Sequence, residues 1–197
     1  MTARRYLFLA AALIAGVVYR AEEGRGGLFG RTLTDAQQVI ADTKINHGDL
    51  TIAGSADRED TTYDPGQPIT LSVKTNKDAH VAILRVLANG DTTIVFPNQG
   101  HRDAAIAGNT VLTVPNPGDV VKLAADKPGI ILFEFIASTS GASWLFKRAP
   151  DKGSDFADLG VTTRDIAKDL VSTLKVGGGP ETAAIYLTVR IAGRGLL

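Results

Sequence analysis

A strict period-two alternation near the C-terminus is the feature that most constrains the fold. Its apolar positions are Ala183, Ile185, Leu187, Val189 and Ile191, and the intervening ones are Ala184, Tyr186, Thr188 and Arg190. Successive side chains of a strand point to opposite faces, so this segment has one wholly apolar face and one mostly polar face. It predicts a strand whose sheet has one side on a core.

Further strand patterns precede it, and they are separated by turn signals. The expected strands are Ile69–Val73, His80–Leu87, Thr92–Phe96, Val111–Val114, Val120–Leu123 and Ile130–Ala137. Asn89-Gly90 favours a two-residue type I′ hairpin, and Pro115–Gly118 favours another turn. Because there is no alternation of strands with helices, we expect a mainly β fold, an antiparallel β-sandwich of immunoglobulin-like type with one or two peripheral helices.

Two segments carry helix signals. Thr34 and Gln37 have the spacing of a capping box and predict a short helix that extends to about Lys44. Thr163 is a candidate N-cap for a second helix, whose apolar line at fourfold spacing is Ile166, Leu170 and Leu174. This helix is expected to lie on the sheet and to end at Gly177–Gly179.

The N-terminus has the pattern of an export segment. Arg4 and Arg5 precede an apolar run from Leu7 to Val18, which is short for a membrane span. We therefore expect a signal peptide or short anchor at 1–21, a linker with a short helix at 22–48, and a single β-sandwich domain at 49–197. The expected location is periplasmic or secreted, with membrane contact only through an uncleaved N-terminal segment.

Composition excludes several classes of protein. The absence of cysteine excludes disulfides, thiolate metal sites and a cysteine nucleophile. The first twenty residues contain three arginines and no acidic residue, so the rest of the chain is slightly acidic. No basic stripe is present, and we expect neither a nucleic-acid partner nor a cofactor.

An ordered series of short motifs spans about residues 63–138. It includes Tyr63-x-x-Gly66, Asp78–Leu84, Asn89-Gly90, Phe96-Pro97-Asn98 and Ile106-Ala107-Gly108, and it closes at Val114-Pro115. This series resembles the bacterial family known as domain of unknown function 4384. His80 departs from it, because the family commonly has Tyr there. The resemblance implies an accessory binding or scaffolding module and supplies no catalytic residues.

Two segments are candidate binding sites, each with a structural alternative. Phe96, Pro97 and Asn98 could form a docking edge, although a strand end followed by a turn is the favoured interpretation. Trp144, Phe146, Lys147 and Arg148 could form an exposed aromatic-basic patch for a glycan or a protein, or could cover the core.

No catalytic or metal site is expected. His47, His80 and His101 lack ligand spacing. The acidic loop Asp57–Asp64 could hold calcium, but the favoured interpretation is a solvated loop. Glu134, a lone acid on an apolar face, is either a carboxyl of raised pKa or an edge-strand charge, and the edge interpretation is favoured.

These observations favour a non-enzymatic envelope protein that binds another protein of a cell-surface or secretion assembly. A glycan-binding module is the alternative, and it requires Trp144, Tyr63 and Tyr186 to meet on one open face. An unfamiliar hydrolase is the third possibility, and it requires Glu134, a histidine or a serine to meet in one cleft.

Overall fold

The structure is a computed structural model, and it describes residues 32–125, 127–148, 150, 152–174 and 179–193. The segment at 1–21, expected from the sequence to be a signal peptide or short anchor, lies outside the described residues, as does the first part of the linker. Of Gly177–Gly179, the glycines expected to end the second helix, the structure describes only Gly179.

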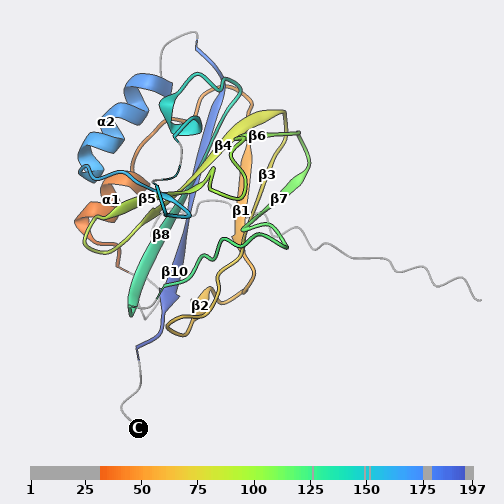
Figure 1. Cartoon of the computed structure of the whole chain (residues 1–197). Helices are drawn as coiled ribbons and strands as arrows, with labels where there is room; N and C mark the ends of the chain where they lie inside the picture. Colours follow the sequence, from red (N-terminus) through yellow and green to blue (C-terminus); the bar gives the residue numbers. More distant parts are fainter. Residues whose placement is uncertain (1–31, 126, 149, 151, 175–178, 194–197) are drawn as a thin grey trace, which may run out of the picture.

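The strands form two sheets (Figure 1). The small sheet has the order β1-β3-β7, from β1 (Ile52–Ala56), β3 (Leu71–Thr75) and β7 (Val111–Val114). The large sheet has the order β2-β10-β8-β4-β5-β9, and β6 also pairs with β4. Its strands are β2 (Thr62–Tyr63), β4 (Ala79–Val86), β5 (Thr92–Phe96), β6 (Ala105–Ile106), β8 (Gly129–Ser138), β9 (Ala157–Asp158) and β10 (Thr182–Ile191).

All pairings are antiparallel except that of β2 with β10, which is parallel. The longest ladder joins β10 to β8 along the full length of both strands, from Thr182 opposite Ser138 to Ile191 opposite Gly129. The expected mainly β fold of antiparallel sheets with two helices is therefore confirmed.

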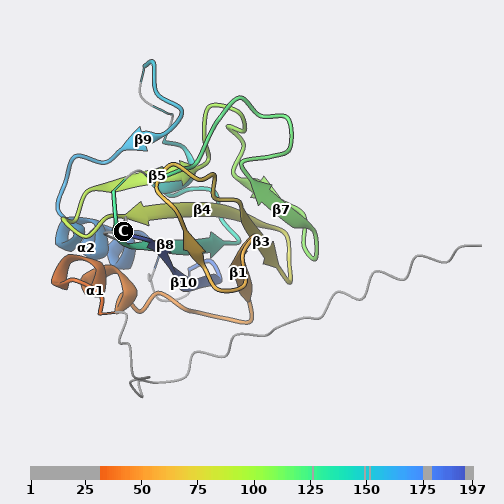
Figure 2. The same ribbon diagram turned by 90° about the horizontal axis from the view of Figure 1, so that it is seen from below.

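Two helices cover the face of the large sheet that points away from the small sheet (Figure 2). They are α1 (Asp35–Ala41) and α2 (Thr163–Leu174), and a 3-10 turn, η1 (Trp144–Phe146), joins them on that face. The helices thus form a layer on the outer face of the large sheet.

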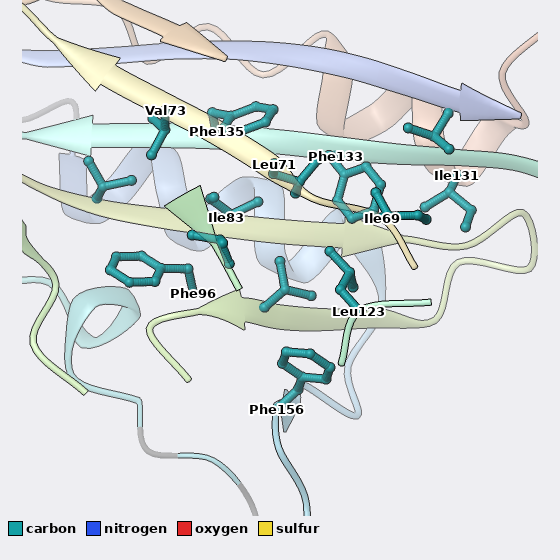
Figure 3. Packing of buried hydrophobic residues seen from close by; sticks show 14 of the residues in the cluster. Ile69, Leu71, Val73, Ile83, Phe96, Leu123, Ile131, Phe133, Phe135 and Phe156 are labelled. Atoms are coloured by element: carbon teal, nitrogen blue, oxygen red, sulfur yellow. The ribbon is translucent and has the colours of Figure 1, made fainter. Parts of the chain in front are cut away.

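Strand β8, inside the large sheet, is buried on both faces over most of its length. Ile131, Phe133 and Phe135 face the small sheet and belong to the core between the sheets (Figure 3). Leu132 and Ile136 face the helices and pack in a second core with residues such as Ile40, Ile166 and Leu170. Burial on both faces explains why this strand is a nearly continuous apolar run.

The predicted helix starts are confirmed at one helix and displaced by one residue at the other. Thr34 and Gln37 form the capping box of α1, which ends at Ala41 instead of continuing to Lys44. At α2 the side chain of Thr162, not Thr163, accepts a hydrogen bond from the Asp165 N–H at 3.2 Å. Thr163 is buried and is the first helical residue.

Two strand-level predictions were wrong. The Asn89-Gly90 hairpin is not type I′, since only Gly90 has a positive φ (93°). The Leu87 N–H bonds to the Asp91 carbonyl and the Gly90 N–H to the Leu87 carbonyl, as in a three-residue loop with a bulge. Val120–Leu123 is not a strand: it belongs to no ladder, and the isolated bridge to Pro68 is made by the next residue, Ala124.

Candidate functional site

Phe96, Pro97 and Asn98 are buried where β5 ends. The Phe96 ring lies in the core, with its centroid 5.3 Å from that of His101. Asn98 is 1% exposed; its Nδ2 donates to the Val95 carbonyl at 3.1 Å, and its Oδ1 accepts from the Gly100 and His101 N–H groups at 2.9 Å each. The motif shapes a turn and presents no exposed edge at these three residues.

The Trp144–Arg148 segment covers the helix-side core. Phe146 is buried there, Trp144 is half-buried, and only Lys147 and Arg148 are exposed. The Arg148 Nη2 donates to the Asp158 carbonyl at 3.3 Å. The aromatic side chains therefore pack inward, which leaves a basic surface rather than an aromatic-basic one.

The three aromatic residues of the glycan alternative do not share an open face. Tyr63 is fully buried between the sheets, and its hydroxyl donates to Asp57 Oδ1 at 2.6 Å. Trp144 is half-buried against the helix-side core, whereas Tyr186 on β10 is 51% exposed. Only Tyr186 is available as an open aromatic surface among these three.

The acidic loop is organised by hydrogen bonds of its own. Asp57 Oδ1 also accepts from the Thr70 N–H at 2.9 Å, and Asp60 Oδ1 accepts from the Thr62 N–H at 3.0 Å. Within the described ranges, no group of three or more His, Asp or Glu side chains is placed to hold a metal ion.

The residues required for a hydrolase lie along two strands rather than around a cleft. His80 on β4 is directly opposite Ser138 on β8. Ser138 is fully buried, and its hydroxyl oxygen accepts a bond from the Ser140 N–H at 3.1 Å. Glu134 lies on β8 four residues before Ser138, about 13 Å from it at the rise of a strand.

Glu134 is the most perturbed acid of the fold. It is 4% exposed on the helix-facing side of the central strand β8, and its Oε2 has no hydrogen-bond partner among the described residues. Burial raises the pKa of this carboxyl to about 8, and the positive charge of Lys44 opposes the shift. The edge-strand interpretation of Glu134 was wrong, because β8 has β10 on one side and β4 on the other.

The shallow hollows on the surface include one beside β10 and one beside the small sheet. The larger, of about 410 Å³, lies between the chain entering β1 and the start of β10 and is lined by Asn46, His47, Gly48, Leu50, Thr51, Ile52 and Thr182–Ile185. The smaller, of about 230 Å³, is bordered by Pro68, Pro115 and Pro117 at one end of the small sheet. Sequence reasoning missed the larger hollow because its two walls are far apart in the chain.

The larger hollow adjoins the outer edge of β10. The Thr182 N–H and C=O bond to His47, and the Ala184 N–H donates to Asn46 Oδ1 at 2.7 Å. At the other end, the Arg190 N–H donates to the Thr61 carbonyl beside β2. Within the described part of the chain, this side of β10 pairs with His47 at Thr182 and with β2 at Arg190 and Ile191.

No helix within the described ranges has the length and apolar content that a membrane crossing requires. Neither the curated proteins nor the solved structures include a match to this chain. Residues 62–141, which run from β2 through β8, match the model of the family described as Domain of unknown function (DUF4384), and over this part the chain resembles that family.

Proposed function

We propose that this protein is an exported, non-enzymatic interaction module of the bacterial cell envelope. In this role it acts as an accessory part of a cell-surface or secretion assembly, either free in the periplasm, secreted, or held by its N-terminal segment. Its partner is another protein of that assembly.

The observation that supports this proposal most is the outer edge of β10. Among the described residues, the outer side of β10 at Thr182–Ala184 bonds to the single residues His47 and Asn46, and a strand flanked in this way can exchange such contacts for those of another chain. The adjoining hollow of about 410 Å³ adds Leu50, Ile52 and Ile185 as a partly apolar surface. Strand edges of this kind are common docking sites for extended segments.

In-cell cross-linking followed by purification of the full-length protein tests the proposal. We expect one discrete envelope protein to be retained, at a level above that seen without cross-linker. Mass spectrometry of the purified chain should show either a new N-terminus near Ala21 or an intact Met1, which separates the cleaved from the anchored form.

A matched control is Val171→Lys, a change at an exposed position on α2, across the sheet from the hollow. This variant should retain the same partner. If the wild-type chain retains no envelope protein above background in repeated cross-linking, the proposed function is wrong.

A further inference from the structure

Strand β7 (Val111–Val114) is the last strand of the small sheet, and it pairs with β3 on one side only. In Figures 1 and 2 it lies at the side of the molecule that is remote from the helices. Among the described residues, no strand pairs with its other side. That side of β7 is therefore a strand edge.

The backbone of β3 shows which of its residues bond to β7. Alternate residues of a strand direct their N–H and C=O groups to opposite neighbours. The carbonyl of Thr70, just before β3, accepts a hydrogen bond from the N–H of Asp57, just after β1, at 2.8 Å. Residues of even number in this part of the chain therefore bond to the β1 side, and Leu71 and Val73 bond to β7.

The hydrogen bonds of β7 follow from this alternation. Val114 and Leu112 are opposite Leu71 and Val73, and they use their main-chain groups on β3. Val111 and Thr113 alternate with them, so they direct N–H and C=O groups away from the sheet. In the part of the chain that the structure describes, no hydrogen bond to these outward groups is formed. Each of the two residues thus offers one donor and one acceptor to another strand.

The side chains of this edge do not oppose pairing. Natural edge strands commonly carry a lysine, a proline or a bulge that blocks the addition of a further strand. The four residues of β7, Val-Leu-Thr-Val, include none of these. Val111 is 56% exposed although it is apolar and β-branched, a type of residue that favours strands. An uncharged edge with an exposed valine is suited to a strand partner.

A second copy of the same edge fits it in one antiparallel register. A two-fold axis through Leu112 places Val111 of each copy directly opposite Thr113 of the other. Opposite residues that both direct their main chain across the gap exchange two N–H···O bonds. Every outward group of Val111 and Thr113 is then paired in both copies. Their β-branched side chains lie on the outer face of the sheet and form a cross-strand pair.

The ends of β7 limit the ladder to this short stretch. Asn109 has a φ of 62°, and Pro115 has no N–H to donate, so neither residue extends the pairing. Thr113 also lines the hollow of about 230 Å³, together with Pro115 and Pro117. Because Thr113 is opposite Val111 of the other copy, the two-fold axis brings that exposed valine to the rim of the hollow. Each copy gives and receives this contact.

The charge at this edge also permits a symmetric pair. Lys74 lies opposite Val111 on β3, one strand away from the edge. In the two-fold arrangement the Lys74 residues of the two copies are separated by three inter-strand spacings, about 14 Å or more. This separation exceeds the Debye length of about 10 Å at 0.1 M ionic strength, so their repulsion is largely screened.

We propose that the outer edge of β7 joins two copies of this protein as an antiparallel strand pair centred on Leu112. The small sheets of the two copies then form one continuous sheet. This inference goes beyond the proposed function and does not depend on which envelope protein is bound. Because the contact is short, we expect a weak dimer, with a Kd on the order of 0.1 mM.

Sedimentation of the full-length chain over about a hundredfold range of concentration around that value measures the association. Val111→Lys should weaken it at least about tenfold, since the change removes the apolar contact and adds a charge to each side of the ladder. The matched control is Val161→Lys, at a valine of similar exposure (52%) before α2. This variant should associate like the wild type. Association through any other part of the chain would persist in both variants.

The register is tested by a single introduced cysteine, because the chain has none of its own. Across the axis, the Leu112 residues of the two copies are a non-hydrogen-bonded pair with Cα atoms about 4.5 Å apart, within the range of a disulfide. With diamide as oxidant, Leu112→Cys should form linked dimers at least about tenfold faster than Val161→Cys. If Leu112→Cys does not fold, an equimolar mixture of Val111→Cys and Thr113→Cys makes the same test, because these two residues are opposite.

Three results would overturn the inference: a monomeric chain over the whole range, association unchanged by Val111→Lys, or equal rates of disulfide formation at the edge and at Val161. In-cell cross-linking separates this inference from the proposed function. If Val111→Lys loses the envelope partner while the purified wild type stays monomeric, the edge of β7 binds that partner and not a second copy. If Val111→Lys no longer self-associates but retains the partner, both proposals are supported.

Discussion

Glu134 has the least favourable environment for a charge of any acid described in the fold. Its carboxyl lies between Leu84 on β4 and Tyr186 on β10, under the helix layer. The ionised form would lose its hydration there without a paired counter-ion. The protonated form is therefore favoured up to a pH of about 8.

This raised pKa predicts a stability that falls as pH rises. Between the usual value of 4.5 and about 8, the unfolded chain releases the proton while the folded chain keeps it. The free energy of unfolding should therefore decrease by on the order of 1 kcal/mol per pH unit in that window and level off above it. Glu134→Gln should remove this slope and be the more stable chain at pH 8. Urea denaturation of both chains at pH 5, 7 and 9 measures the free energy of unfolding and its slope with pH.

The exposed Glu59 provides the control for this titration. Glu59→Gln should keep the wild-type slope. Equal slopes in the wild type and in Glu134→Gln would show that Glu134 ionises freely in the folded state.

Asn98 carries a second prediction at the residue scale. Its amide makes three hydrogen bonds to main-chain groups of its own turn and is buried. Asn98→Ala should lower the free energy of unfolding by about 2–4 kcal/mol, since it leaves buried groups unpaired. Asn89→Ala, at an exposed hairpin position, should cost under about 1 kcal/mol. Similar losses for both variants in urea denaturation would contradict the structural role of Asn98.

Helix α1 shows how one polar side chain can attach an element to a sheet. Gln37 is fully buried, accepts a bond from the Thr34 N–H, and donates from Nε2 to the carbonyls of Val86 and Ile130 at 3.1 and 2.9 Å. These two carbonyls lie at the adjacent ends of β4 and β8. The same amide therefore caps the helix and positions it on the sheet.

Replacing this amide by a side chain of similar size tests that attachment. Gln37→Leu should lower the free energy of unfolding by about 2–4 kcal/mol, because two strand carbonyls and the cap N–H lose their partner. Gln38→Leu, on the exposed side of α1, should change it by less than about 0.5 kcal/mol. Thermal unfolding of both variants makes the comparison, and equal effects would mean that Gln37 does not anchor α1.

The elements differ in how well the sequence predicts them. Thr92–Phe96 and Val111–Val114 agree with β5 and β7 residue for residue, and the β8 and β10 segments agree to within one residue at each end. A period-two pattern identifies β10 because burial acts on every second residue, whereas β8 is recognised as a nearly continuous apolar run bounded by turn signals. The Asn89-Gly90 hairpin was predicted with the wrong turn type, since Asn89 does not adopt the positive φ that type I′ needs.

Features that depend on contacts across the chain could not be predicted from local pattern. On the outer side of β10, the Ala184 N–H donates to the side chain of Asn46, which is 138 positions away in the chain. Gln37 reads as a capping residue in the sequence, and its two strand contacts appear only after the sheet has formed. Alternation indicates which side chains of a strand share a face, but it does not indicate which strand ends up at an edge.

At the scale of the whole molecule, the segment that resembles the known family is only part of the packed body. Residues 62–141 include β2 to β8 but not β1, β10 or either helix. Ile40 and Ile45, which precede the domain start expected at residue 49, are fully buried in the helix-side core. Both cores therefore draw on residues outside the matched segment.

This division predicts that residues 62–141 do not fold alone. Without β10, strand β8 loses its longest ladder, and without α1 and α2 the helix-facing side of β4 and β8 exposes Leu84, Leu132 and Ile136 to water. Each such side chain left exposed forfeits about 1.5–3 kcal/mol, which a small domain cannot sustain. The 62–141 fragment should give a poorly dispersed NMR spectrum and no cooperative unfolding transition, whereas residues 32–197 should unfold cooperatively. A dispersed spectrum from 62–141 would mean that the family segment is a folding unit by itself and that β10 and the helices are additions to it.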